Sequence, residues 1–314
     1  MRQTLAAGVS YLDLNFQGRA RVIASVIVEG SSGVAIVDPG PSSTLRTLRL
    51  ALEGAGIALS DVTTLLLTHI HLDHAGAAGT LVAENPALRV YVHERGAPHL
   101  IDPAKLVASA TRLYGDEMDR LWGSVSPVPE SAIQILTGAR GERVTAGGRI
   151  FEVAYTPGHA SHHVSYFNSD TGIAFVGDTG GVKLQPNGYA LPPTPPPDID
   201  LEAWRDSLTC IAAWRPDTLF LTHFGPMTPA EPHLAEFRDH LETIAGLVKT
   251  SLDQPGDTED DDGKREAWFT DQVMRELRTR VSDEQARAYE VAGRFDLNWR
   301  GLARYWRKKG SVTR

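Results

Sequence analysis

The stretch THIHLDHAG, residues 68–76, decides the fold of this chain. It follows the apolar run TTLLL, which is typical of a buried central strand that ends in a loop. Imidazole and carboxylate groups are common ligands of zinc and related ions, so the cluster predicts a metal site at a strand end. The stretch supplies four candidate ligands within six positions: His69, His71, Asp73 and His74.

More ligands must come from elsewhere in the chain, because four ligands from one segment crowd a single ion. We therefore expect two neighbouring ions that share ligands from several strand ends. Three candidates follow predicted strands in the second half: His159 in TPGHASHH, Asp178 in FVGDTG and His223 in LTHFGP. These nitrogen and oxygen ligands favour zinc, with manganese, iron or cobalt as alternatives. Two further histidines, His162 and His163, follow His159. We favour His163 as a residue that orients a metal ligand by hydrogen bonding without binding the metal itself.

The composition indicates a globular protein. The chain has 314 residues, 42% of them hydrophobic, which allows one large domain with an appendage or two domains. Its formal net charge of −8 argues against a nucleic-acid partner. The single cysteine, Cys210, lies in the apolar stretch LTCIAAW and is predicted to be a small buried residue. With no apolar leader and no run of 18 apolar residues, we expect a cytoplasmic protein without a membrane partner.

An internal sequence repeat, which we call the internal echo, predicts the architecture. TLLLTHI (64–70) resembles TLFLTHF (218–224), and VAIVDPG (34–40) resembles IAFVGDTG (173–180). Each half runs from a strand hairpin through a helix to an apolar strand that ends in Thr-His. We therefore predict an α+β fold with two similar halves, in which the sheets face each other and the helices lie outside. The predicted helices span about 43–55 and 201–214, and the stretch 95–135 reads as helical and irregular.

The composition changes after residue 250. DQPGDTEDDDGK (253–264) is acidic and reads as a solvated linker. Apolar residues then recur every fourth position, and SDEQ (282–285) is a capping box that begins another helix. We predict one main domain over 1–250 and a linker with a helical extension over 251–314. The extension is expected to pack on the core or to join two chains in a homodimer.

The motifs HIHLDH, TPGHASHH, VGDTG and LTHFGP resemble, in this order, those of the metallo-β-lactamase-fold hydrolases. The resemblance covers roughly residues 20–245 and is greatest to the branch of glyoxalase II and the lactonases. It implies an αβ/βα sandwich of two mixed sheets, to which the helical C-terminal extension would be appended. It also implies one metal held by His69, His71 and His159 and a second held by Asp73, His74 and His223. Asp178 would bridge the two metals. Asp38 would support the metal ligands without binding a metal itself.

The sequence differs from several other branches of this family, and these differences restrict the branch that it resembles. The β-lactamases of this fold generally lack the bridging aspartate that Asp178 would supply. The redox-active di-iron branch carries Glu at the position of His71, and persulfide dioxygenases lack a complete second site. Lactonases often carry a tyrosine just after the bridging aspartate, and Tyr189 is the nearest candidate here. The nuclease branch typically adds an inserted domain or arm, which this sequence lacks.

These features predict a binuclear hydrolase of carboxylic esters, thioesters or lactones. A hydroxide between the two metals would attack the acyl carbon, and Asp73 would orient the attacking water and shuttle its proton. A phosphodiesterase or nuclease of the same fold is the first alternative, and an inactive metal-binding regulatory protein is the second. The segment 180–197, with Leu184 and Tyr189, is expected to line one wall of the pocket for a small acyl substrate. Trp122 and its neighbours at 105–125 are expected to line another.

Overall fold

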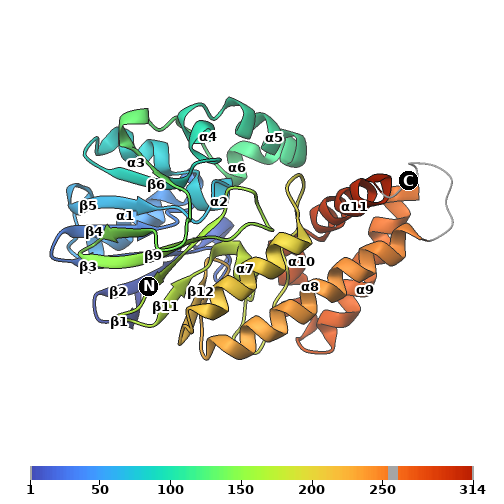
Figure 1. Ribbon diagram of the computed structural model, residues 1–314. Coiled ribbons are helices and arrows are strands. Elements are labelled where there is room, and N and C mark those ends of the chain that lie inside the picture. Colours follow the sequence, from blue (N-terminus) through green and yellow to red (C-terminus); the bar gives the residue numbers. More distant parts are fainter. Residues whose placement is uncertain (1, 254–260, 313–314) are drawn as a thin grey trace.

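The computed structural model describes residues 2–253 and 261–312, which form two mixed β-sheets with helices on their outer faces (Figure 1). The first sheet has seven strands in sequence order. They are β1 (Arg2–Ala6), β2 (Val9–Asp13), β3 (Ala24–Gly30), β4 (Gly33–Val37), β5 (Val62–Leu66), β6 (Arg89–His93) and β7 (Ile133–Leu136). Strands β1–β4 pair antiparallel and strands β4–β7 pair parallel, so the predicted mixed sheet is confirmed.

The second sheet has six strands in the order β13-β12-β11-β10-β9-β8. They are β8 (Arg143–Ala146), β9 (Arg149–Tyr155), β10 (Val164–Asn168), β11 (Ile173–Phe175), β12 (Thr218–Leu221) and β13 (Gly225–Met227). Only the β11–β12 pair is parallel. Side chains from the inner faces of both sheets, among them Val26, Leu66, Phe151 and Tyr166, form one buried cluster. This cluster holds the two sheets face to face, as expected for a sandwich.

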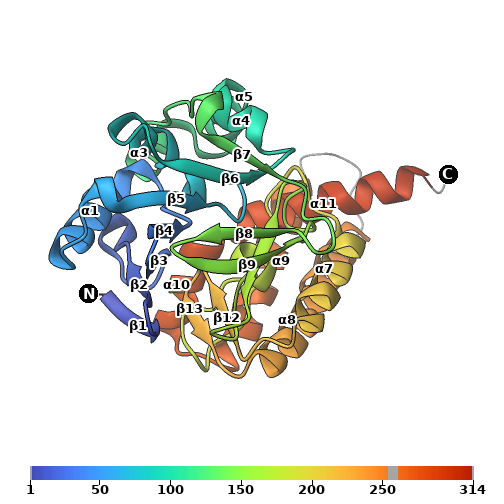
Figure 2. The same cartoon turned by 60° about the vertical axis from the view of Figure 1, so that its left-hand side comes forward.

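Helices cover the outer face of each sheet, and Figure 2 shows the two layers from another side. Those next to the first sheet are α1 (Leu45–Gly54), α2 (Leu72–Ala75), α3 (Ala78–Glu84), α4 (Ala97–Ile101), α5 (Ala104–Tyr114) and α6 (Met118–Leu121). Those next to the second sheet are α7 (Leu201–Ala213) and α8 (Ala230–Leu252). Three further helices pack on α8 or on one another: α9 (Asp262–Arg278), α10 (Asp283–Gly293) and α11 (Phe295–Val312). No helix in the described part of the chain has the length and apolar character that crossing a bilayer requires.

The internal echo of the sequence corresponds to two equivalent units. In the first half β4, α1 and β5 form a parallel βαβ unit, and in the second half β11, α7 and β12 do the same. Each unit ends in Thr-His, at Thr68-His69 and at Thr222-His223. Because carboxyl ends of parallel strands lie at the same edge of a sheet, each unit delivers its histidine to that edge.

The C-terminal helices complete the core of the second half. Apolar side chains at the predicted four-residue spacing, including Phe269, Val273 and Leu277, are buried in one cluster with Phe237 of α8. The capping box that opens α10 is present, because Ser282 and Gln285 each accept a hydrogen bond from the backbone N–H of the other. Most of the predicted acidic linker, residues 254–260, lies outside the described residues. The domain boundary at residue 250 and the homodimer stay predictions.

The prediction for Cys210 is wrong. Its side chain is exposed, because it lies on the face of α7 opposite the buried Leu208 and Ile211. An apolar stretch without a clear period does not tell which residues of a helix face outward.

Candidate metal centre

The two Thr-His dipeptides meet at one buried carboxylate, that of Asp38. Its Oδ2 accepts hydrogen bonds from the hydroxyls of Thr68 (2.8 Å) and Thr222 (2.9 Å). The same oxygen lies 2.8 Å from Nδ1 of His74, and Oδ1 accepts the backbone N–H of Thr68 at 2.8 Å. Asp38 has a φ of 49°, which non-glycine residues rarely adopt, and these bonds hold it there. Asp38 therefore links the ends of β5 and β12 by hydrogen bonds, next to the cluster of candidate ligands.

Three ring nitrogens converge in a first group of candidate ligands. Nδ1 of His71 lies 3.0 Å from Nε2 of His69 and 2.9 Å from Nε2 of His159. The three side chains could hold one ion between them. His69 follows β5, His71 directly precedes α2, and His159 lies in the loop after β9, so both sheets contribute.

A second group lies beside the first. Nε2 of His223 lies 3.3 Å from Oδ2 of Asp73 and 3.3 Å from Nε2 of His74. Asp73 and His74 belong to the short helix α2, and His223 follows β12. The group again draws on both halves of the chain, and its three side chains could hold a second ion.

The carboxylate of Asp178 faces both groups. Its Oδ2 lies 3.4 Å from Nε2 of His159 in the first group, and its Oδ1 lies 3.2 Å from Nε2 of His74 in the second. Oδ1 is buried and makes no hydrogen bond with any described residue. A buried anionic oxygen without a donor is costly, whereas a cation beside it would satisfy it. The donor set therefore fits the divalent ions that the sequence predicts.

Hydrogen bonds at the outer nitrogens of two candidate histidines also favour metal binding. Nδ1 of His159 lies 2.8 Å from the carbonyl oxygen of Pro193, and Nδ1 of His223 lies 2.6 Å from that of Val22. Since a carbonyl can only accept, both Nδ1 atoms carry the proton, and each Nε2 presents its lone pair to the centre. Histidine ligands of metals are typically held in this way.

Burial and charge act on the cluster in opposite directions. Burial alone would lower the pKa of His74, but the carboxylates of Asp178 and Asp73 outweigh it and raise that pKa well above its usual value. Burial would raise the pKa of Asp73, yet the neighbouring His74 and His223 lower it to about 2. The buried carboxylates therefore favour a positive charge at this position, which a metal ion would supply.

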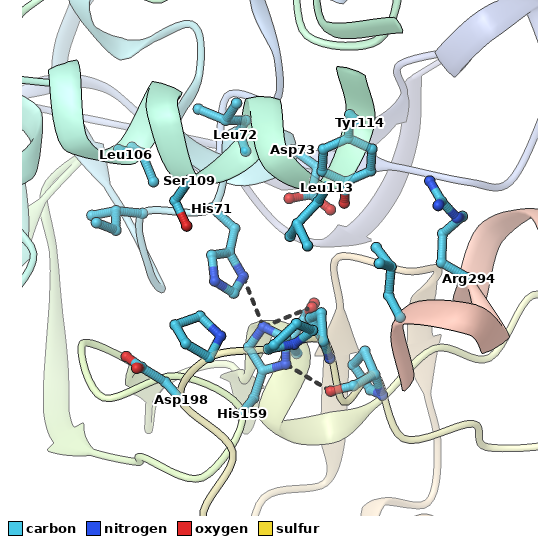
Figure 3. Close-up of a pocket in the computed structure, with 18 of the residues that line it drawn as sticks. His71, Leu72, Asp73, Leu106, Ser109, Leu113, Tyr114, His159, Asp198 and Arg294 are labelled. Atoms are coloured by element: carbon cyan, nitrogen blue, oxygen red, sulfur yellow. Dashed lines mark hydrogen bonds and ion pairs between the residues drawn. The ribbon is translucent and has the colours of Figure 1, made fainter. Parts of the chain in front are cut away.

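A cavity of about 410 Å³ opens onto the cluster (Figure 3). In Figure 3, Leu106, Ser109 and Leu113 of α5 lie across the cavity from His159, and Arg294 lies at one side. Trp122 lines the cavity, as does the proline-rich segment through Pro193, Pro195, Pro196 and Pro197.

Two of the three predicted substrate contacts are not at this cavity. The prolines of segment 180–197 line the cavity, but Tyr189 lies further inside the protein, where it is fully buried and its ring stacks on that of His240 with 3.7 Å between the centroids. Leu184 lines a separate small cavity next to Tyr289. The tyrosine that does line the main cavity is Tyr114 of α5, which the sequence did not single out.

The cavity is also more basic than the sequence suggested. Lys183, the only cation of segment 180–197, is buried and pairs with Glu236 at 2.6 Å. Four other cations line the cavity instead: Arg95, Lys105, Arg112 and Arg294. They come from three separated segments, which is why no local pattern revealed them.

The two histidines after His159 lie near the cluster. His163 is fully buried, with its ring stacked on that of His69 at 5.0 Å between centroids. Its Nδ1 lies 3.0 Å from the hydroxyl of Thr156, so His163 does not orient a candidate ligand through any hydrogen bond that the structure records. His162 lines the cavity.

A model of the metallo-β-lactamase superfamily matches residues 18–223, a range that holds all seven candidate ligands and ends at His223. The chain belongs to the metallo-β-lactamase superfamily. Members of this superfamily are generally metal-dependent hydrolases, and this member has His and Asp groups able to hold metal. It is therefore a metallo-β-lactamase superfamily hydrolase.

Curated relatives place the chain near two kinds of superfamily member. It is 29% identical over 220 residues to the metallo-β-lactamase fold-containing protein ST1585 of Sulfurisphaera tokodaii, covering 68% of this chain and 78% of that protein. It is 27% identical over 143 residues to hydroxyacylglutathione hydrolase of Legionella pneumophila. That match covers 46% of this chain and 41% of the enzyme, so it spans less than half of the enzyme's length.

Solved structures of the superfamily share the fold. The family protein TTHA1429 from Thermus thermophilus superposes with a TM-score of 0.69 at 23% identity, covering 98% of this chain and 95% of that one. The archaeal protein ST1585 superposes with a TM-score of 0.62 at 20% identity, covering 94% and 98%. The predicted sandwich with C-terminal helices is thus confirmed.

Proposed function

We propose that this superfamily hydrolase is binuclear and cleaves the acyl bond of a carboxylic ester, thioester or lactone. One observation carries the proposal. The carboxylate of Asp178 lies between two groups of three ligands, with one oxygen toward each, beside a cavity the size of a small molecule. Two divalent ions, zinc by preference, would supply Lewis acidity and a nucleophilic water at neutral pH.

The chain's own residues would position that water and the substrate. Asp73 is ionised at neutral pH, because its pKa is about 2, and its side chain keeps 24% of its surface exposed. It can therefore accept a hydrogen bond from the attacking water and orient it. Burial raises the pKa of Tyr114, so its hydroxyl stays protonated and can donate a hydrogen bond inside the cavity.

The acyl class is supported by the relatives and by the cavity. The hydroxyacylglutathione hydrolases named above act on an acylated thiol, and their match covers about half of this chain. The cavity joins apolar walls, from Leu106 and Leu113, to the polar cluster at His71 and Asp73, which suits an acyl group.

Phosphodiester hydrolysis is the second candidate, and the four cations of the cavity favour it. Arg and Lys side chains are common phosphate partners. An inactive regulatory protein has less support, because neither candidate group lacks a ligand.

One substrate panel separates these functions. Metal-loaded protein would be assayed with p-nitrophenyl esters, thioesters, lactones and bis-p-nitrophenyl phosphate. We expect kcat/KM for the best acyl substrate to exceed that for the phosphodiester at least about a hundredfold, or roughly 2.7 kcal/mol in transition-state stabilisation. Comparable rates, or faster cleavage of the phosphodiester, would favour the second candidate. No hydrolysis by protein with two metals bound would favour the regulatory role.

A further inference from the structure

Helix α5 turns two different stripes of side chains toward the cavity. Positions four and seven residues apart lie on the same side of a helix. Lys105, Ser109 and Arg112 follow this spacing and form a polar stripe, which we call the basic stripe. Leu106, Ala110 and Leu113 follow the same spacing one residue later and form an apolar stripe. All six side chains line the cavity, so a ligand in it meets both stripes.

The charges of the basic stripe are available to a ligand. Lys105 and Arg112 form no ion pair or hydrogen bond with any residue that the structure describes, and both are exposed. Arg95, which follows β6, also lines the cavity. Its guanidinium carbon lies 5.6 Å from the centre of the Tyr155 ring, and the side chain likewise has no carboxylate partner in the described chain.

Each of the other charged side chains of the cavity has an ion-pair or hydrogen-bond partner or belongs to the candidate metal centre. Arg294 binds both oxygens of Asp296, at 2.9 and 2.8 Å, and packs over the ring of Tyr114. Asp198 accepts the hydroxyl of Ser161 at 2.6 Å. The remaining carboxylates, Asp73 and Asp178, belong to the candidate metal centre. Three cations of the cavity, Arg95, Lys105 and Arg112, therefore have no ion-pair partner among the described residues, although the whole chain carries a net charge of −8.

We infer that the basic stripe, with Arg95, binds a carboxylate or phosphate on the leaving group of the substrate. The apolar stripe then packs against the uncharged part of the same substrate. The inference rests on the proposed function and names its substrate class, an acyl thioester or ester whose carrier is anionic. In the reaction, water adds to the acyl carbon and the bond from that carbon to sulfur or oxygen breaks. The products are a carboxylic acid and the anionic thiol or alcohol.

Direct binding tests this without any turnover. The probes are three thioethers, which cannot be hydrolysed: S-hexylglutathione with carboxylates, S-hexyl coenzyme A with phosphates, and the uncharged S-hexyl-N-acetylcysteamine. Calorimetry on the full chain would compare the wild type with the double variant Lys105→Gln/Arg112→Gln. We expect the variant to bind at least one anionic thioether about tenfold or more weakly, and the uncharged one equally well.

A matched control removes the same charge elsewhere. Arg46 and Arg140 are exposed, lie outside the cavity and form no recorded ion pair within the described chain. Arg46→Gln/Arg140→Gln should leave all three affinities unchanged. For the wild type, affinity for the anionic thioether should fall between 50 and 300 mM salt, because salt screens exposed charges.

The outcomes separate this inference from the proposed function. The tighter anionic thioether identifies the group as carboxylate or phosphate. Equal loss for all three probes, no effect of the double variant, or no binding of either anionic probe would overturn the basic stripe as an anion site. If the anionic probe binds as expected but no acyl compound is cleaved, the proposed function fails and the anion site stands.

Discussion

The side chain of Asp178 differs from the other six candidate ligands because each of its oxygens faces a different group. Asp178→Ala should therefore weaken zinc binding at both positions, by more than the roughly 10–100-fold typical of residues behind a metal site. His223→Ala removes a nitrogen from the second group only and should leave one tight zinc per chain. Zinc titration with elemental analysis measures both. Retention of two tight ions by Asp178→Ala would contradict the bridge.

His233, outside the metal cluster, provides a test of pH dependence. It is buried, its Nε2 donates to the carbonyl of Gly180 at 2.8 Å, and burial lowers its pKa to about 4. Between about pH 6.5 and 4 the unfolded chain binds a proton here that the folded chain does not. The stability contribution is thus complete above pH 6.5 and is lost as the pH falls.

The matched variant His233→Gln keeps an N–H donor but does not titrate. Urea unfolding of metal-free protein from pH 7 to 4.5 should show a steeper loss of stability in the wild type than in the variant. The difference approaches about 1.4 kcal/mol per pH unit, the value for one proton. Parallel curves would mean that His233 has an ordinary pKa in the folded state.

Sequence patterns identify single residues best where the chemistry is local. The structure brings together the seven candidate ligands that the short motifs contain, and their role as metal ligands stays a prediction. Arg112, Tyr114 and Arg294 also line the cavity, where Arg294, between α10 and α11, packs over the ring of Tyr114 of α5. No short motif contains them, and a single sequence does not report which helices meet.

At the scale of elements, α11 supports the candidate metal centre through a loop. Buried Asn298 accepts the backbone N–H of Thr194 at 2.8 Å and donates to the carbonyl of Pro192 at 3.3 Å. The carbonyl between them, that of Pro193, accepts the proton on Nδ1 of His159. The C-terminal helix thereby fixes the loop that orients one candidate ligand.

Asn298→Ala should therefore weaken zinc binding in the group that contains His159, about tenfold, in line with other partners behind metal ligands. The control Ala303→Gly destabilises the same helix by roughly 1 kcal/mol without touching the loop. The control should lower the unfolding midpoint but keep zinc affinity. Equal zinc affinity in both variants would show that Asn298 acts only through stability. Zinc titration and urea unfolding of each variant measure the two effects.

Three of the strands that the sequence did not predict share a physical reason. β1, β7 and β8 lie at sheet edges, and few of their residues are buried: none in β1, one in β7 and two in β8. Such short strands lack the continuous apolar run that marked β5. By contrast, the central strands and the helices of both βαβ units follow the predicted ranges within a few residues, because burial on both faces leaves a strong pattern.

At the scale of the molecule, each ligand group joins the two sheets. Ions bound there would stabilise only the folded chain, by about 2.7 kcal/mol per site at a hundredfold excess over Kd. Removal of metal by a chelator should lower the thermal midpoint by several degrees, at roughly 2 °C or more per kcal/mol. Readdition of zinc should restore it. A midpoint that is the same with zinc and with chelator would contradict the metal-holding role of these groups.

The arrangement of the ligands also suits a protein that is divided in two. All strands of the first sheet end by Leu136, all strands of the second begin at Arg143, and Ala139 and Arg140 between them are exposed. A cut between Ala139 and Arg140 leaves each sheet whole, but it separates His159 and His223 from the other members of their groups. Neither fragment contains a complete ligand group. Reassociation of the fragments would therefore rebuild both groups at once, so metal uptake could report whether two proteins fused to the fragments bind each other.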